Sequence, residues 1–265
     1  MNGAAADSAA ARKANGMGVL QQQVALVTGA ASGIGSAIAD AYAAEGARLF
    51  LADRDADRLT ALAERYTAQG TEVATAIVDV ADAEQTRQMV ESCVSALGVP
   101  DILVNSAGIL TEVPLVDMDV ETWDQMIAID LRSVFLCCRW AVPHMVARGS
   151  GRVINIASQL GIKGGEGLVH YSAAKAGVIG LTKALAREVG PSGVLVNAIA
   201  PGPVFTPLVD GISADWKKAK QAELPLGRFG VPAEVAPTAV LLASDPGGNL
   251  YVGQTLGPNS GDVMP

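Results

Sequence analysis

Short apolar runs alternate with longer amphipathic segments along most of the chain. Runs rich in Val, Ile, Leu and Ala predict seven β-strands, at residues 24–28, 47–53, 72–80, 101–107, 152–158, 194–200 and 254–258. Between them, a helical period predicts helices near residues 34–45, 55–69, 83–97, 122–147, 171–189 and 232–244, with capping residues such as Asp82, Thr122 and Ser172. This alternation predicts a single α/β domain, a doubly wound, seven-stranded parallel sheet with helices on both faces.

Two segments depart from the alternation. Residues 1–22 are rich in Ala, Gly and Asn and have no apolar core, so they predict a disordered leader before a domain that spans residues 23–265. The segment at about 204–226 is long for a connection and mixes apolar with charged residues, as expected of a mobile lid over a substrate. Packing against the edge of the sheet explains its apolar residues equally well.

Composition and charge exclude several classes of function. The net charge of −8 disfavours binding to nucleic acid or to an anionic membrane, and no apolar run reaches the length of a spanning helix. Three cysteines without paired spacing argue against a disulfide framework and favour a cytoplasmic protein. With two histidines and no HExxH or CxxC spacing, we expect no metal site.

A glycine-rich loop follows the first predicted strand, where TGAASGIG at residues 28–35 leads into a helix. Gly29, Gly33 and Gly35 allow a tight turn, close approach of the backbone to a pyrophosphate, and packing of the helix against the strand. The helix N-terminus adds free N–H groups and a positive dipole end. Many strand-to-helix turns carry two glycines for steric reasons, so the loop indicates a dinucleotide site only together with its context.

Asp53 supplies part of that context, because it ends the second predicted strand 18 residues after Gly35. A carboxylate there can accept hydrogen bonds from the adenosine ribose hydroxyls and repel a 2′-phosphate. Arg54 could pair with that phosphate, but the loop has Ala31 rather than a basic residue, so we expect NAD in preference to NADP. A plain turn or capping role for Asp53 stays open. Asp79 could likewise cap the next helix or face an adenine amino group.

Candidate catalytic residues follow the fifth predicted strand. Ser158 ends that strand, and Tyr171 and Lys175 lie 13 and 17 residues later, four apart and therefore on one face of a helix. An ammonium about 4 Å from the phenol contributes about 4 kcal/mol at an effective dielectric of about 20. That corresponds to about three pKa units before desolvation is subtracted, so we expect the pair to titrate near pH 7.

These segments, with NSAG at residues 105–108 and PGPVFT at residues 201–206, resemble the short-chain dehydrogenase/reductase family over about residues 22–261. The resemblance implies a Rossmann sheet of strand order 3-2-1-4-5-6-7. It makes Tyr171 the general acid/base, Lys175 the residue that holds the nicotinamide ribose and lowers the tyrosine pKa, and Ser158 a hydrogen-bond donor to the substrate oxygen. The coenzyme site it implies comprises Gly29, Ser32, Gly33, Ile34, Gly35, Asp53, Asp79, Val80, Asn105, Ala107, Gly108, Tyr171, Lys175, Pro201, Gly202, Val204 and Thr206.

Two of these implied roles are specific. Asn105 would close the adenine side of the coenzyme groove, and Thr206 would reach the carboxamide or pyrophosphate of the coenzyme. The sequence also departs from the family pattern. Ser106 replaces an Asn with little expected consequence, whereas Asp130 stands where the family carries the Asn that completes its catalytic tetrad. A backbone role survives that exchange, but a carboxylate brings a negative charge near Lys175.

The loops after the fourth, fifth and sixth strands should bound the substrate, and their apolar residues indicate a small, mostly apolar carbonyl or alcohol. We therefore expect an NAD-dependent oxidoreductase that interconverts a secondary alcohol and a ketone. A catalytically idle NAD(H)-binding sensor or scaffold, or an epimerase or dehydratase that retains its coenzyme, are the alternatives. By resemblance, the helices at 122–147 and 171–189 pair subunits in a homotetramer. His170 is expected to be exposed and without a catalytic role.

Overall fold

A computed structural model describes residues 18–209 and 214–264 of the chain. Its strands are β1 (Val24–Thr28), β2 (Arg48–Asp53), β3 (Val73–Ile77), β4 (Ile102–Asn105), β5 (Gly151–Ile156), β6 (Val194–Ile199) and β7 (Thr255–Leu256). They form one sheet in the order β3-β2-β1-β4-β5-β6-β7, and every neighbouring pair is parallel. The predicted single Rossmann domain and its strand order are confirmed.

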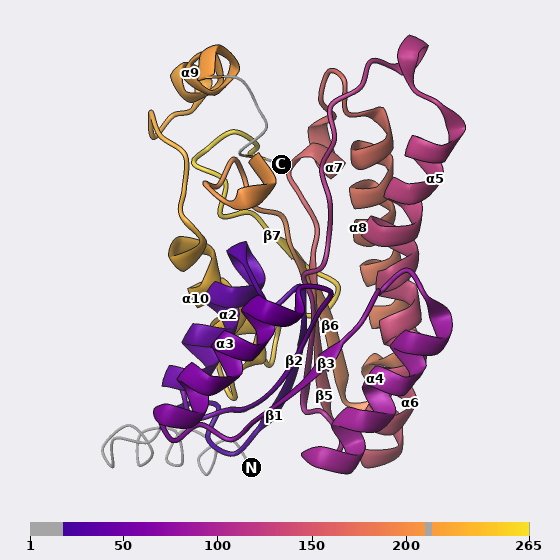
Figure 1. The fold of residues 1–265 in the computed structure, drawn as a ribbon, viewed down its shortest axis with the longest axis vertical. Helices are drawn as coiled ribbons and strands as arrows, with labels where there is room; N and C mark the ends of the chain where they lie inside the picture. Colours follow the sequence, from indigo (N-terminus) through magenta and orange to yellow (C-terminus); the bar gives the residue numbers. More distant parts are fainter. Residues whose placement is uncertain (1–17, 210–213, 265) are drawn as a thin grey trace.

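The helices lie in two layers on either side of this sheet (Figure 1). The chain forms α2 (Gly33–Ala44), α3 (Ala56–Ala68), α4 (Ala83–Ala96), α5 (Val120–Ile127), α6 (Ser133–Arg148), α7 (Leu160–Lys163), α8 (Val169–Val189), α9 (Ala214–Glu223) and α10 (Pro232–Ala243). Helices α2, α3 and α10 cover one face, and α4, α6 and α8 cover the other. Short α7 and α9 lie beyond the carboxyl ends of the strands, near the C-terminus (Figure 1).

Alternate strand residues supply the two apolar layers. Leu26 and Phe50 pack against the α4, α6 and α8 face, whereas Val27 and Leu51 pack against the α2, α3 and α10 face. Each of these side chains is at most 1% exposed. Burying a side chain of this size stabilises the fold by about 1.5–3 kcal/mol, which explains why the interior strands are mostly apolar.

The helix expected at residues 122–147 is interrupted. It begins at Val120, because the Asp119 carboxylate accepts the backbone N–H of Thr122 at 2.7 Å, so Asp119 and not Thr122 is the cap. A π-helical turn, Ala128–Arg132, then separates α5 from α6 and widens the backbone by one residue. Such turns are frequent at functional sites, and this one carries Asp130.

The other capping predictions differ in outcome. Asp82 caps α4 as expected, since its carboxylate accepts the N–H groups of Glu84 and Gln85 at 2.8 and 2.9 Å. Ser172 does not cap α8, because that helix begins at Val169 and the Ser172 N–H already donates to the carbonyl of Leu168 at 2.8 Å. The helix therefore begins three residues before Ser172, which lies inside its first turn.

The predicted leader is wrong for residues 18–22. Leu20 is fully buried, its N–H donates to the carbonyl of Glu45 at 3.0 Å, and Gln22 donates to the carbonyl of Gly46 at 2.9 Å. These contacts hold the segment against the connection between α2 and β2. The remainder of the predicted leader, residues 1–17, lies outside the described residues.

Candidate active site

Thr28 joins two of the loops at the carboxyl edge of the sheet. Its hydroxyl donates to the carbonyl of Val104 at 3.3 Å and accepts the N–H groups of Ser106 and Ala107 at 3.1 and 3.3 Å. The glycine-rich loop after β1 and the NSAG loop after β4 are therefore held side by side. This is the edge at which ligands bind in doubly wound sheets.

Glycine is required twice in the loop after β1. Gly29 has φ of +65°, and a Cβ on it would lie 2.7 Å from backbone atoms of Ala107. A Cβ on Gly35 would lie 2.2 Å from the carbonyl oxygen of Gly29. Ser32 is the N-cap of α2, and within the described chain its side chain makes no capping hydrogen bond. The first N–H groups of α2 are thus available to an anionic ligand.

Asp53 shapes this loop from the end of β2. One carboxylate oxygen accepts the N–H of Ala31 at 2.9 Å, and the other accepts the N–H of Asp55 at 3.1 Å. Asp55, in turn, caps α3 by accepting the N–H of Arg58 at 3.0 Å. Asp53 is therefore a turn residue that orients the glycine-rich loop, and its partly exposed carboxylate lies beside that loop.

Asp79 and Val80 follow β3. The Asp79 carboxylate accepts the N–H of Ala81 at 2.9 Å and closes a turn, so the alternative in which Asp79 caps the next helix is wrong, since Asp82 performs that function. Val80 is 7% exposed and packs in the core.

Asn105 has its side chain inside the sheet. It is 3% exposed, and its amide donates to the side-chain oxygen of Asn155 at 2.8 Å. Asn155 then donates to the hydroxyl of Thr182 at 2.9 Å, so a buried polar chain connects β4, β5 and α8. The Asn105 amide nitrogen thus has its partner inside the sheet, and the expectation that Asn105 closes the adenine side of a coenzyme groove stays a prediction.

Thr206 approaches the glycine-rich loop from the far end of the chain. Its Cγ2 is 3.4 Å from the position that a Cβ would take on Gly33. It follows Val204, which is buried and forms a single parallel bridge with Gly230, and the PGP turn at residues 201–203. Thr206 therefore lies beside the glycine-rich loop, and the expectation that it reaches the carboxamide or pyrophosphate of a coenzyme stays a prediction.

Ser158, Tyr171 and Lys175 form the centre of the site. All are at most 7% exposed. The Lys175 ammonium lies 5.6 Å from the centroid of the Tyr171 ring and donates to the carbonyl of Ile156 at 3.1 Å. The Ser158 hydroxyl accepts the N–H of Leu160 at 3.1 Å, and it lowers the pKa of Tyr171. The helical spacing thus brings the two α8 side chains to the serine that follows β5.

The electrostatics of Tyr171 differ from the expectation of a pKa near 7. Burial is the largest effect and raises the pKa of Tyr171 above its ordinary value. The Lys175 charge lowers it, the Asp130 charge raises it, and hydrogen bonding with Ser158 lowers it. Burial therefore outweighs the lysine, and the phenol is protonated at neutral pH in this arrangement.

Asp130 joins the same cluster from the π-helical turn. Its carboxylate lies 3.1 Å from the Lys175 ammonium, and no part of it is exposed. Burial raises the pKa of Asp130, and the Lys175 charge offsets part of this effect. Burial also opposes the charge on Lys175, but Asp130 and Tyr171 outweigh it and leave the pKa of Lys175 above its ordinary value.

His170 is fully buried rather than exposed, contrary to expectation. Its Nε2 lies 2.9 Å from the hydroxyl of Thr111, in the loop that follows β4. Burial lowers the pKa of His170, and the Asp130 charge opposes this. The imidazole turns inward because α8 begins two residues earlier than predicted, which leaves His170 inside its first turn.

A carboxylate near the C-terminus links the segments around the site. Asp262 accepts the ammonium groups of Lys163 in α7 and Lys220 in α9 at 2.6 and 2.8 Å, and it also accepts the side-chain amide of Gln159. Burial opposes its ionisation, but the two lysines outweigh burial and hold the pKa of Asp262 below its usual value. Sequence analysis missed this cluster, because Asp262 lies 42 to 103 residues from its partners in the chain.

The segment at 204–226, expected to be a lid, contains a short helical turn, Pro207–Val209, and α9. Residues 210–213 lie outside the described residues. The rings of Phe205 and Phe229 pack with centroids 5.0 Å apart. The two ends of the segment are thus anchored by an aromatic contact and by the Asp262 cluster.

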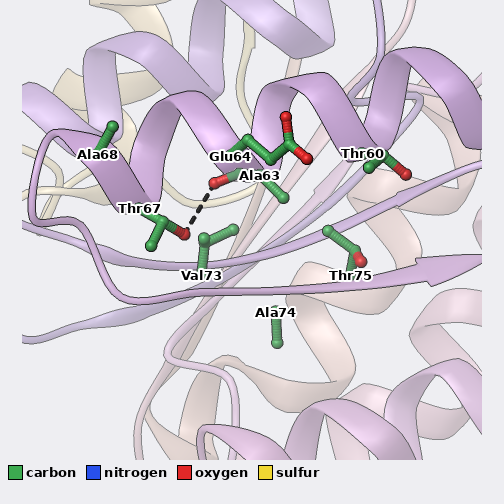
Figure 2. A pocket seen from close by; sticks show the side chains of 8 residues that line it. All are labelled: Thr60, Ala63, Glu64, Thr67, Ala68, Val73, Ala74 and Thr75. Atoms are coloured by element: carbon green, nitrogen blue, oxygen red, sulfur yellow. Dashed lines mark hydrogen bonds between the residues drawn. The ribbon is translucent and has the colours of Figure 1, made fainter.

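A hollow of about 480 Å³ lies between α3 and β3, the outer strand at one side of the sheet (Figure 2). Its walls are mostly Ala and Thr side chains, and Glu64 is the only ionisable residue that lines it. The Thr67 hydroxyl is satisfied by the carbonyl of Ala63 at 2.9 Å. No member of the Ser158, Tyr171 and Lys175 group lines it, so it is unsuited to the chemistry described above.

Two further observations concern metal-binding clusters and membrane-spanning helices. In residues 18–209 and 214–264, no group of three His, Cys, Asp or Glu side chains is arranged to hold a metal ion. No helix in this part of the chain has the length and apolar character that crossing a bilayer requires.

The fold and the site define an oxidoreductase of the short chain dehydrogenase family, whose family pattern matches residues 23–217, and the chain belongs to this family. Oxidoreductases of this class interconvert ketones and alcohols. One similar protein is the 3-oxoacyl-(acyl-carrier-protein) reductase FabG of Thermotoga maritima, 38% identical over 245 residues that cover 92% of this chain and 99% of that protein.

Two other relatives show a similar level of identity. The 3-oxoacyl-(acyl-carrier-protein) reductase of Synechocystis is 39% identical over 249 residues, covering 94% of this chain and all of the relative. The (2S)-[(R)-hydroxy(phenyl)methyl]succinyl-CoA dehydrogenase subunit BbsD of Thauera aromatica is 38% identical over 237 residues, covering 89% and 95%.

Proposed function

We propose that the protein is an NAD(H)-dependent oxidoreductase in which Tyr171 is the general acid/base for a ketone and its secondary alcohol. The observation that carries this proposal is the convergence of Ser158, Tyr171 and Lys175 at the edge of the sheet that also holds the glycine-rich loop. A buried phenol, a hydroxyl and an ammonium in one cluster are the groups that proton transfer to a carbonyl oxygen requires.

The residues present fit a dinucleotide. The backbone at Gly29 and Gly35 is too closely packed for any side chain, and the first N–H groups of α2 receive no hydrogen bond from the side chain of the N-cap, Ser32. When bound, a nicotinamide coenzyme supplies or accepts the hydride. The residues proposed to hold it are Gly29, Ser32, Gly33, Ile34, Gly35, Asp53, Asp79, Val80, Asn105, Ala107, Gly108, Tyr171, Lys175, Pro201, Gly202, Val204 and Thr206, of which Val80 and Asn105 contribute backbone atoms.

The side chains divide the proton chemistry among them. In reduction, the Tyr171 hydroxyl gives its proton to the substrate oxygen, while the Ser158 hydroxyl donates a hydrogen bond to the same oxygen. The Lys175 ammonium stabilises the tyrosinate that remains. In oxidation, the tyrosinate takes the proton back. Burial raises the pKa of Tyr171, so the protonated phenol is the form that would donate to a ketone oxygen.

The preference for NAD rests on Asp53. Its carboxylate lies beside the glycine-rich loop and accepts the N–H of Ala31 at 2.9 Å, so it would set a negative charge next to the adenosine ribose of a dinucleotide held by that loop. A ribose with free hydroxyls can donate to it, whereas a 2′-phosphate is repelled.

The substrate class is suggested by the relatives. Two are named for a 3-oxoacyl group on acyl carrier protein and one for a hydroxy(phenyl)methyl succinyl-CoA, so an acyl group on a carrier with an oxo or hydroxy substituent is common to their names. We propose a mostly apolar acyl thioester of this kind.

The exposed apolar side chains Phe135 and Val169 on α6 and α8 are consistent with helix pairing in a cytoplasmic homotetramer.

Tyr171→Phe tests the function directly. It removes the transferable proton and little contact area, so we expect turnover of 3-oxoacyl thioesters to fall by at least about a thousandfold while NADH binding changes only a few-fold. The absorbance of NADH measures turnover, and quenching of protein fluorescence measures NADH binding. Retention of more than a tenth of the wild-type kcat would show that Tyr171 is not the acid/base.

A further inference from the structure

Asp130 is a fully buried carboxylate that the proton chemistry above does not use. One of its oxygens accepts the N–H of Ile109 at 2.8 Å, and the other lies 3.1 Å from the Lys175 ammonium. Lys175 also donates to the carbonyl of Ile156 at 3.1 Å. A single side chain therefore ties the π-helical turn to the loop after β4 and to α8.

The backbone above this pair leaves no spare room. A Cβ on Gly108 would lie 3.0 Å from the Asp130 carboxylate oxygen and 3.5 Å from the Lys175 nitrogen. Gly108 belongs to the NSAG loop, one of the segments proposed to hold the coenzyme. The Asp130 carboxylate and the Lys175 ammonium thus pack against the NSAG loop, so a small movement of either group would displace that loop.

We propose that Asp130 is a positioning residue, which fixes the Lys175 ammonium against the loop at Ile109 and restrains the effect of that ammonium on Tyr171. The proposal rests on the proposed function insofar as it treats Tyr171 as the acid/base. It goes further because it assigns a separate role to a carboxylate that touches neither substrate nor coenzyme in that scheme.

The restraint follows from charge. Tyrosinate is stabilised by the Lys175 ammonium and opposed by the Asp130 carboxylate, so the net charge beside Tyr171 is far smaller than a lone lysine would supply. His170 is the remaining titratable group that faces Asp130 from α8. On the same turn as Asp130, Arg132 is directed away and donates to the carbonyl of Ala81 at 2.9 Å.

Asp130→Asn separates the two functions of the side chain. The amide oxygen can still accept the N–H of Ile109, but the negative charge is removed. We expect the pH midpoint of Tyr171 ionisation to fall by about half to one unit, a three- to tenfold change in its acid constant. The shift is downward because the group removed is the one that opposes tyrosinate.

The primary measurement needs no substrate. Tyrosinate absorbance is titrated in wild-type protein and in Asp130→Asn, each corrected by the same protein carrying Tyr171→Phe. Asp124→Asn, which removes an exposed charge from α5, is the matched control and should leave the midpoint unchanged. An unchanged or raised midpoint in folded Asp130→Asn would overturn the proposal.

Turnover supplies a second readout. The pH profile of kcat/KM in Asp130→Asn should move downward by the same amount, with little change in the KM for coenzyme at neutral pH. If the absorbance midpoint shifts but no thioester turns over in any variant, the proposed function fails while the positioning role stands. A fall in kcat at every pH with no movement of the midpoint contradicts the positioning role.

A measurement on the unmodified protein covers the case in which Asp130→Asn does not fold. With isotopically labelled lysine, the Lys175 signal should titrate above the ordinary lysine value, because the adjacent carboxylate favours the charged form. A Lys175 midpoint below that ordinary value would mean that burial prevails over the pairing, and the proposal would be overturned.

Discussion

Asp53 offers the sharpest separation between a structural and a ligand-binding role. Both of its carboxylate oxygens are occupied in the protein, one by the N–H of Ala31 at 2.9 Å and one by the N–H of Asp55 at 3.1 Å. Asp53→Ala removes both hydrogen bonds. Asp53→Asn retains one, because the amide oxygen can accept only one of these groups and its NH₂ faces the other donor.

The magnitudes follow from this geometry. Hydrogen bonds to a charged group contribute about 1.5–3 kcal/mol each, and partial exposure places these at the low end or below, so Asp53→Ala should lower the free energy of unfolding by about 2 kcal/mol. For coenzyme choice, a unit charge about 6 Å from a dianionic 2′-phosphate at a dielectric of about 80 gives about 1.4 kcal/mol, which is about tenfold. Partial burial increases this value.

The assay uses the ratio of two dissociation constants. Distortion of the glycine-rich loop weakens NADH and NADPH equally, so it cancels in the ratio, whereas loss of the charge does not. We expect wild-type protein to prefer NADH, and Asp53→Ala to reduce that preference at least about tenfold. The exposed Asp57→Ala is the charge control in the next helix. A wild-type preference for NADPH would refute the reasoning, and Arg54→Ala would then test the neighbouring guanidinium.

The remaining predictions concern packing and acid stability. Gly161→Ala places a Cβ 2.6 Å from the backbone of α8, so it should lower the free energy of unfolding, measured in urea, by about 1–3 kcal/mol. Gly180→Ala meets no atom within 4 Å and should raise that free energy slightly. Equal effects of the two substitutions would contradict this reasoning. Asp262→Asn should cost about 1–3 kcal/mol at pH 7. Since the folded pKa of Asp262 is depressed by Lys163 and Lys220, that difference should close as pH falls below about 4, and a constant difference would contradict the pairing.

The sheet could be predicted from the sequence because each interior strand is covered on both faces. Runs such as residues 24–28 and 194–200 are therefore apolar except for Thr28 and Asn197, which are buried and hydrogen-bonded. The lengths of the two outer strands of the sheet, β3 and β7, were predicted less well. The predicted strand 72–80 shortens to Val73–Ile77, where one face is partly exposed, and the 254–258 strand to Thr255–Leu256.

The catalytic cluster could be predicted in part, because i and i+4 positions on a helix must share a face. Tyr171 and Lys175 therefore come together in any structure that has α8. The pKa of Tyr171 could not be predicted, since it depends on burial and on Asp130 from another element. The Asp262 cluster and the inward turn of His170 were missed for the same reason, as their contacts join residues with no pattern in the local sequence.

The buried chain of polar groups beneath the site explains how the catalytic helix is held in register. Asn105 donates to Asn155, and Asn155 donates to Thr182 on α8, two turns beyond Lys175. An unsatisfied buried amide costs about 1–3 kcal/mol, so sliding α8 along the sheet would break these hydrogen bonds together with that from Lys175 to Ile156. The core thus fixes the position of the helix, while Asp130 fixes the ammonium at its end. The orientation of the acid/base is therefore determined by residues on four different elements, of which only α8 carries a recognisable local spacing.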